Sequence, residues 1–236
     1  MTVTIFDEIA QWVFDFNHDG VETSSLSAED KKSRVLHFLS TAKKSLEILN
    51  QDKLLVVRTI HCYNYDKEDA LYKVISINDT NFTAVESILD THLDKWTGNG
   101  FIPPIILQGS TLIFSDNENK FLDGIIKVMI DFSVQDLHIT TYSDCWIPID
   151  RNDQLQLEMA ELNAPRLQQA LSEIYQAGFH SVFPAPDEPY CDHLLPQKGF
   201  SVMMRPVMLN EVDLSNLDSS QRAAIDKYVF HTNTSL

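Results

Sequence analysis

The chain has 236 residues, of which 34 are Asp or Glu and 18 are Lys or Arg, so its formal net charge at pH 7 is −16. A surface of this charge repels nucleic acid and anionic lipid and attracts basic partners over long range. The 44% apolar content is too high for a disordered chain, and the length allows one sizeable core. We therefore expect a single globular domain over residues 1–236.

The N-terminus and the cysteines predict a cytoplasmic protein. The sequence shows no basic start, apolar block and small-residue cleavage site of a secretion signal, and no apolar run of the roughly 20 residues that a membrane span needs. Cys62, Cys145 and Cys191 are too few and too far apart for a disulfide framework, which fits free thiols in a reducing compartment. We expect a partner that is neither nucleic acid nor membrane.

The N-terminal part, about residues 1–50, is expected to be helical. Apolar residues at steps of three and four predict an amphipathic helix over residues 4–17. Ser27 has the position of a helix cap, and an apolar stripe from Val35 to Leu49 predicts a second helix over about residues 28–50.

The pattern then changes to that of strands. The β-branched runs at 54–60 and 71–77 predict an antiparallel pair, and the helical spacing of apolar residues predicts a helix over about 81–96. Short apolar runs on either side of residues 108–111, which have Gly-Ser at their centre, predict a tight hairpin.

Two further strands and a helix are expected next. Alternating apolar residues predict strands over 124–132 and 137–142, and Asn163 followed by Pro165 predicts the start of a helix that runs to about residue 177.

The C-terminal region begins with a proline-rich loop. Four prolines between residues 179 and 198 predict a long loop without regular structure, followed by a strand over 200–205 and a helix over 219–229. Because the strands cluster along the chain, we expect an α+β fold, with a mainly antiparallel sheet of roughly five to seven strands and helices packed on one face.

The familiar catalytic motifs are missing from the sequence. It contains no P-loop, no dinucleotide fingerprint, no Gly-x-Ser-x-Gly and no His-Glu-x-x-His, and no Cys/His set has zinc spacing, so we expect no cofactor and no metal. A small hydrolase remains an alternative. It would use either Cys191 and His193 in the proline-rich loop or the group Asp131, His138 and Asp144.

One acidic and aromatic segment predicts a partner-binding site. Residues 101–162 contain ten acidic and three basic residues, a net charge of −7, and within them a Trp stands beside acidic residues and close to a Pro. A large rigid anchor inside a charged rim is typical of interface centres. The alternative is that this Trp covers the open end of the sheet core. The candidate partner-binding residues are Asp144, Trp146, Asp150, Asp153 and Glu158.

The sequence thus favours a non-catalytic acidic protein that binds and inhibits a basic protein, such as a bacterial immunity protein that neutralises a nuclease-like toxin. An adaptor or self-associating protein is a further alternative to the hydrolase.

Overall fold

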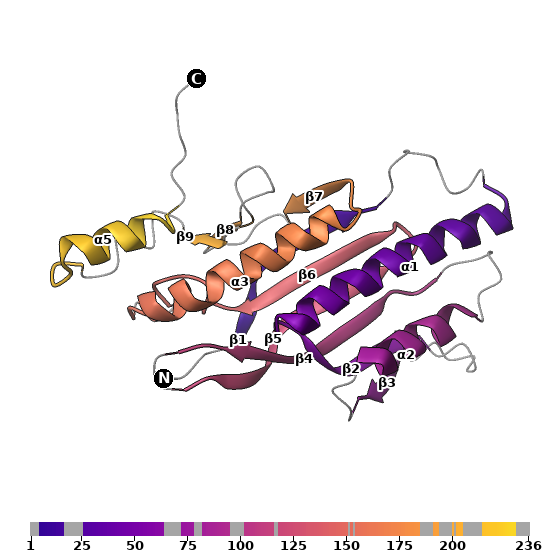
Figure 1. Cartoon of the computed structure of the whole chain (residues 1–236), viewed down its shortest axis with the longest axis horizontal. Helices are drawn as coiled ribbons and strands as arrows, with labels where there is room; N and C mark the ends of the chain where they lie inside the picture. The colour runs from indigo at the N-terminus through magenta and orange to yellow at the C-terminus, as the bar shows by residue number, and fades with distance from the viewer. Residues whose placement is uncertain are drawn as a thin grey trace, which may run out of the picture.

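The computed structural model is shown in Figure 1. It describes residues 5–16, 26–63, 72–77, 82–94, 102–115, 118–150, 152, 154–184, 191–193, 200, 202–204 and 214–229.

A seven-stranded sheet forms the centre of the molecule, in the order β3-β2-β4-β5-β6-β1-β7, and a second sheet pairs β8 with β9. Every neighbouring pair is antiparallel. The strands are β1 (Ile5–Asp15), β2 (Val56–Tyr63), β3 (Tyr72–Ser76), β4 (Ile105–Ile113), β5 (Lys120–Asp131), β6 (Asp136–Ser143), β7 (Ser181–Pro184), β8 (Cys191–His193) and β9 (Val202–Met204).

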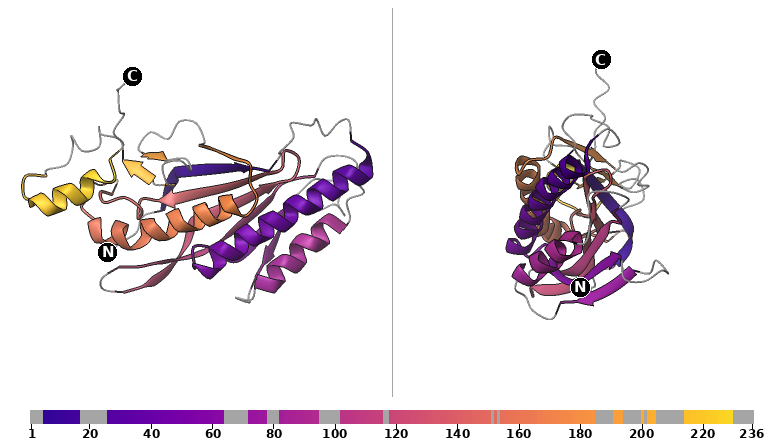
Figure 2. Two further views of the ribbon diagram at one scale, coloured as in Figure 1. Left: turned by 45° about the horizontal axis from the view of Figure 1, so that its top comes forward. Right: turned by 90° about the vertical axis from the view of Figure 1, so that its right-hand side faces the viewer.

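The helices pack on one face of the main sheet. α1 (Ala28–Gln51) lies between α2 (Phe82–Asp94) and α3 (Leu157–Gln176), and α5 (Ser219–Asp226) lies beside the first half of α3 (Figures 1 and 2). This arrangement confirms the α+β prediction with its antiparallel sheet and one-sided helices. None of the described helices is long and apolar enough to cross a membrane.

The core lies between the helices and the sheet. Residues directly opposite one another on neighbouring strands share a face, and one such row of fully buried side chains crosses five strands: Ile60, Leu107, Val128, Ile139 and Trp12. Aromatic rings close the core at one end, where Phe38 of α1 meets Phe132 edge to face at 5.9 Å between ring centroids.

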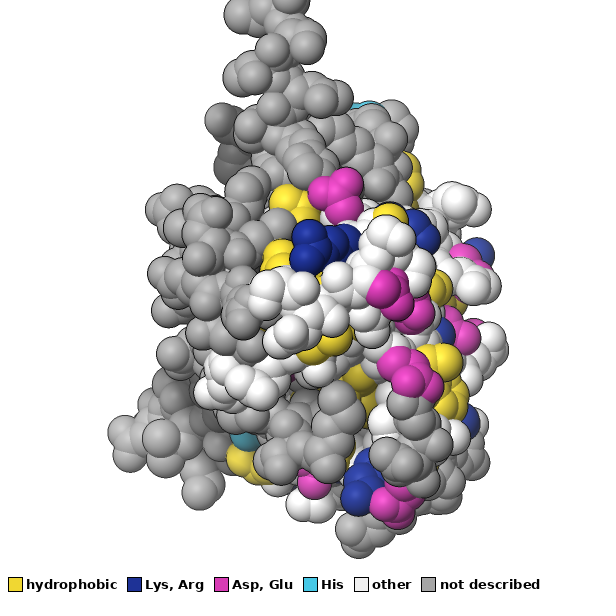
Figure 3. Space-filling model, turned by 90° about the vertical axis from the view of Figure 1, so that its left-hand side faces the viewer, with side chains coloured by type: hydrophobic (Ala, Val, Ile, Leu, Met, Phe, Trp, Pro, Cys, Tyr) yellow, Lys and Arg dark blue, Asp and Glu magenta, His cyan; other side chains and the backbone are white. Residues whose placement is uncertain are grey.

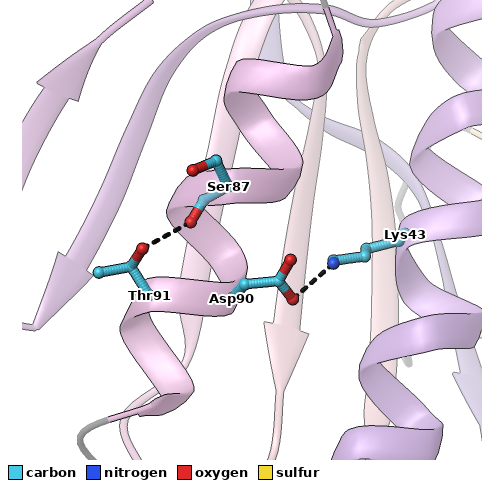
Figure 4. A network of polar contacts seen from close by, with 4 residues as sticks. All are labelled: Lys43, Ser87, Asp90 and Thr91. Atoms are coloured by element: carbon cyan, nitrogen blue, oxygen red, sulfur yellow. Dashed lines mark hydrogen bonds and ion pairs between the residues drawn. The ribbon is translucent and has the colours of Figure 1, made fainter.

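Polar contacts join the helices to one another and to the sheet. Lys43 Nζ of α1 lies 2.5 Å from Asp90 Oδ1 of α2 (Figure 4). Such an exposed ion pair contributes at most about 1 kcal/mol. The half-buried Arg166 of α3 contributes more to positioning, because its guanidinium donates to the carbonyl oxygens of Leu112 at 2.8 Å and of Asp52 at 2.6 Å.

The prediction of a helix over residues 4–17 is wrong, because this segment forms β1. From Ala10 to Asp15 side chains alternate between the two faces, with Trp12 and Phe14 in the core. A register shift between Ile5 and Ala10 leaves both Ile9 and Ala10 buried. This irregularity breaks the period of two, and the remaining spacing of apolar residues resembles that of a helix.

The predicted hairpin at residues 108–111 is also wrong, because β4 passes through it without turning. Gly109 lies where the register of β4 against both neighbours shifts, and its backbone comes close to Val56 of β2. Glycine is therefore required here because two strands approach closely, and not because the chain turns.

Two boundaries in the C-terminal half differ from the prediction. α3 begins at Leu157, before Asn163, and Pro165 lies inside it. Asn163 is fully buried and bonds through its side-chain amide to the backbone N and O of Phe114, so it links α3 to the segment after β4 and does not cap the helix. The proline-rich loop at 179–198 contains β7 and β8, and the rest of its prolines lie outside the described residues.

Leu171 tests the core beneath α3. Its side chain is 0% exposed. Truncation leaves a cavity, so we expect Leu171→Ala to lower the free energy of unfolding in urea by about 2–5 kcal/mol. The matched control is Leu162→Ala on the same helix, where the side chain is 42% exposed. A loss below about 1 kcal/mol at Leu171 would show that this face of α3 is not core.

Gly109 tests the close approach of β4 and β2. A Cβ atom at this position would clash with the carbonyl oxygen of Val56, and a backbone group cannot move aside as a side chain can. We expect Gly109→Ala to lower the free energy of unfolding by about 2 kcal/mol or more. Gln108→Ala, at the exposed neighbouring position, is the control. Equal stability of the two variants in thermal unfolding would contradict the close approach.

Candidate functional site

The open face is the side of the main sheet that faces away from α1, α2 and α3. Figure 2 shows these helices together on the opposite side. The β8–β9 pair packs on the helix side too, since Phe200, just before β9, stacks on the core residue Phe14 at 5.9 Å between ring centroids. No helix of the described part of the chain lies over the open face. Its side chains range from almost fully buried, as at Thr140, to about half exposed, as at Val74 and Phe183.

A row of seven directly opposed residues crosses the open face, one from each strand. In sheet order, this central row consists of Val74, His61, Ile106, Met129, His138, Val13 and Phe183. The five inner members are partly buried, and the two end members, Val74 and Phe183, are 53% and 52% exposed. Apolar and imidazole groups thus run across the whole width of the sheet.

A polar row lies on one side of the central row. It consists of Ser76, Thr59, Gln108, Lys127, Thr140 and Gln11. Neighbouring side chains hold one another in place: Gln11 Nε2 donates to Thr140 Oγ1 at 2.9 Å, and Lys127 Nζ lies 4.9 Å from the centroid of the Tyr142 ring. These contacts fix polar groups at one border of the central row.

An acidic row lies on the other side, at the end of the sheet where β5 turns into β6. It consists of Asp131, Asp136 and Asp15, which are directly opposed on three neighbouring strands. Asp15 accepts a hydrogen bond from Ser181 Oγ at 3.1 Å, and Asp131 accepts from the backbone N of Ser133 at 2.9 Å. Burial, and then the charges of Asp15 and Asp131, raise the pKa of Asp136 to about 7.

His138 stands beside this acidic row in the central row. Burial lowers its pKa, although the nearby Asp131 acts in the opposite direction. The imidazole is therefore mainly neutral at pH 7 and can both donate and accept a hydrogen bond.

The structure places Trp146 in the core. Its side chain is 0% exposed, and its Nε1 donates to Thr141 Oγ1 at 2.7 Å. The neighbouring Asp144 is buried as well. The alternative that this Trp covers the sheet core therefore describes its position, and neither side chain projects from the folded protein toward a partner.

The other residues of the predicted binding segment lie near the start of α3. Asp150 Oδ1 accepts from the backbone N of Asn152 at 2.9 Å and of Gln154 at 2.8 Å, so this carboxylate orders the loop before α3. Glu158 is exposed in the first turn of α3. Asp153 lies outside the described residues. A binding role for these three residues remains a prediction.

Figure 3 looks at the end of the molecule that carries α5 and the start of α3. Among the described residues on this side, acidic side chains are scattered between basic, apolar and uncharged ones (Figure 3). The negative charge of the middle of the sequence is therefore not gathered into one continuous patch on this end.

The two groups considered for a hydrolase differ in what the structure says of them. Asp131 and His138 both lie on the open face, but Asp144 follows the opposite end of β6, roughly 20 Å along the chain from His138 at about 3.4 Å per residue. The three do not form one site. Cys191 and His193 belong to β8, and their side chains are not among those described. In the described part of the chain, no group of His, Cys, Asp and Glu has the arrangement of a metal site.

The central and acidic rows were not recognised from the sequence as a site. The signal was present in part, since alternation in β5 and β6 predicts that Met129, Asp131 and His138 share the less buried face. These residues lie beside Val13 and Asp15 only because β1 pairs with β6. That pairing joins segments more than 120 residues apart, so local patterns in the sequence do not predict it.

No protein-family model, curated protein or solved structure matches the chain. Its function is therefore inferred from geometry and charge.

Trp146 is tested by stability and not by binding. We expect Trp146→Ala to lower the free energy of unfolding by about 3–5 kcal/mol, because it empties a large buried volume and removes the donor to Thr141. Trp146→Phe keeps most of the volume and should cost less. Near-native stability of Trp146→Ala in urea titration would contradict the core position.

Proposed function

We propose that the protein is a non-catalytic acidic binding protein that inhibits a basic protein partner in the cytoplasm, in the manner of a bacterial immunity protein against a nuclease-like toxin. One observation carries the proposal. The open face presents a central row of apolar and imidazole side chains, bordered by three Asp carboxyl groups, on a chain whose net charge is −16.

The central row suits the middle of an interface. Protein interfaces combine an apolar, aromatic centre with a polar rim. Here Met129 and Val13 lie between a polar and an acidic row, and Phe183 is directly opposite Val13. The backbone beneath them is held by the strand pairing of the sheet. Binding would therefore order few residues, which limits its entropic cost.

The charge of the protein suits a basic partner. A net charge of −16 accelerates encounter with a positively charged protein, and carboxylates beside the apolar row can meet its Lys or Arg side chains. The free, buried thiols of Cys62 and Cys145 suit a reducing compartment.

The function is tested by co-expression with basic proteins encoded beside its gene. We expect one of them to arrest growth when expressed alone and to be neutralised when this chain is co-expressed. The purified pair should bind with an association rate that falls steeply as salt rises. Failure of every such protein to bind, together with self-association in a solution mass measurement, would favour an adaptor or self-associating protein instead.

The open face is tested by side-chain truncation in that complex. We expect Phe183→Ala and Val74→Ala each to increase the dissociation rate several-fold, because both side chains are about half exposed at the ends of the central row. Leu36→Ala on α1, at 46% exposure, is the matched control and should leave the rate unchanged.

If the predicted residues Asp150, Asp153 and Glu158 form the contact instead, the effects of the substitutions on the binding rates are reversed. Glu158→Lys would then slow association or speed dissociation, and the truncations on the open face would have no effect. This result would move the interface to the start of α3.

A further inference from the structure

We propose that the acidic row makes the pairing of β1 and β5 with β6 sensitive to pH: one proton shared among three carboxylates strengthens this end of the sheet, and loss of that proton weakens it. This device belongs to the free protein, so it stands whether or not the open face binds a basic partner.

The geometry places the three carboxylates close together. Asp136 is directly opposite Asp131 on one side and Asp15 on the other. Directly opposed residues in an antiparallel sheet have Cβ atoms about 4.5–5.5 Å apart, and like charges at this distance destabilise the pairing. Three ionised carboxylates in this row would therefore repel one another across both strand pairs.

Hydrogen bonding assigns the proton to the middle carboxyl group. Asp15 accepts from Ser181 Oγ, and Asp131 accepts from both the N and the Oγ of Ser133, so the two outer carboxylates have hydrogen-bond donors. Asp136 accepts no side-chain hydrogen bond from the described residues and is partly buried. Burial and the two neighbouring charges together raise the pKa of Asp136 to about 7.

The other groups around this row do not cancel the repulsion between the three carboxylates. On β6 itself, His138 is mainly neutral at pH 7 because burial lowers its pKa. At the start of β7, His180 donates its backbone N–H to the carbonyl oxygen of Asp15. No Lys or Arg of the described residues acts to lower the pKa of Asp136.

The direction of the effect follows from proton linkage. The ordinary pKa of an Asp is 3.8, and that of Asp136 in the folded protein is about 7. Between these two values the folded chain holds the proton and the unfolded chain does not, so stability falls as pH rises from about 4 to about 7 and then levels off. A single proton can raise the unfolding equilibrium constant at most about tenfold per pH unit. Exposure of the row to solvent makes the actual rise smaller than this limit.

The test compares the wild-type protein with Asp136→Asn in urea unfolding from pH 5 to pH 8. The Asn variant cannot ionise, so we expect the ratio of the wild-type to the variant unfolding constant to rise about tenfold or more across this range. Glu161→Gln, which removes one exposed charge from α3, is the control, and its ratio should stay constant. A constant or falling ratio for Asp136→Asn would falsify the proposal.

A second measurement on the wild-type protein keeps the proposal testable if Asp136→Asn does not fold. The carboxyl 13C shift of Asp136 should titrate with a midpoint near 7, and Asp15→Asn should lower that midpoint by removing one neighbouring charge. Protection of the Phe16 amide, which bonds to Gln135 O at the end of the row, should decrease as pH rises through 7. A midpoint below 5 in the wild-type protein overturns the proposal.

Discussion

The register of β1 on β6, and of β6 on β5, is the constraint on which both faces of the sheet depend. Trp12 lies opposite Ile139 and Val13 lies opposite His138, so consecutive residues of β1 belong to the core and to the open face. Side chains along a strand alternate with a period of two, and a slip by one residue would exchange the two faces. Burial of one row beneath the helices therefore determines which residues form the central row on the opposite face.

The irregular parts of the sheet leave this register intact. Register shifts occur between Ile5 and Ala10, between Val57 and Thr59, and between Gln108 and Ser110. Bulges of this kind bend a strand and increase its twist. The central and acidic rows lie in the regularly paired part of the strands, whereas the polar row borders two of these shifts at Thr59 and Gln108. The surface proposed for binding thus coincides with the most regular part of the sheet.

Local signals in the sequence predict those elements whose pattern is uninterrupted. The Ser27 cap and the stripe of α1 are examples, as is the alternation of β5, and these predictions are confirmed. The prediction failed at β1, where the bulge disturbs the period, and at Gly109, where a close approach of strands has the composition of a turn. Local patterns also cannot give the position of β1 between β6 and β7, because that order depends on contacts between distant segments. For the same reason the candidate site could be predicted only in part.

The acidic row is a local conflict inside an otherwise consistent fold. Opposite charges on directly opposed residues stabilise a strand pair and like charges destabilise it, yet Asp15, Asp136 and Asp131 oppose one another. Natural sequences keep such conflicts mainly at functional sites, where another requirement outweighs local stability. The basic partner that we propose for the open face would supply such a requirement, since a cation beside these carboxylates would relieve their repulsion on binding. The arrangement that weakens the free sheet at higher pH therefore also favours the end of the open face near Asp136 as the place where a positively charged protein would contact it.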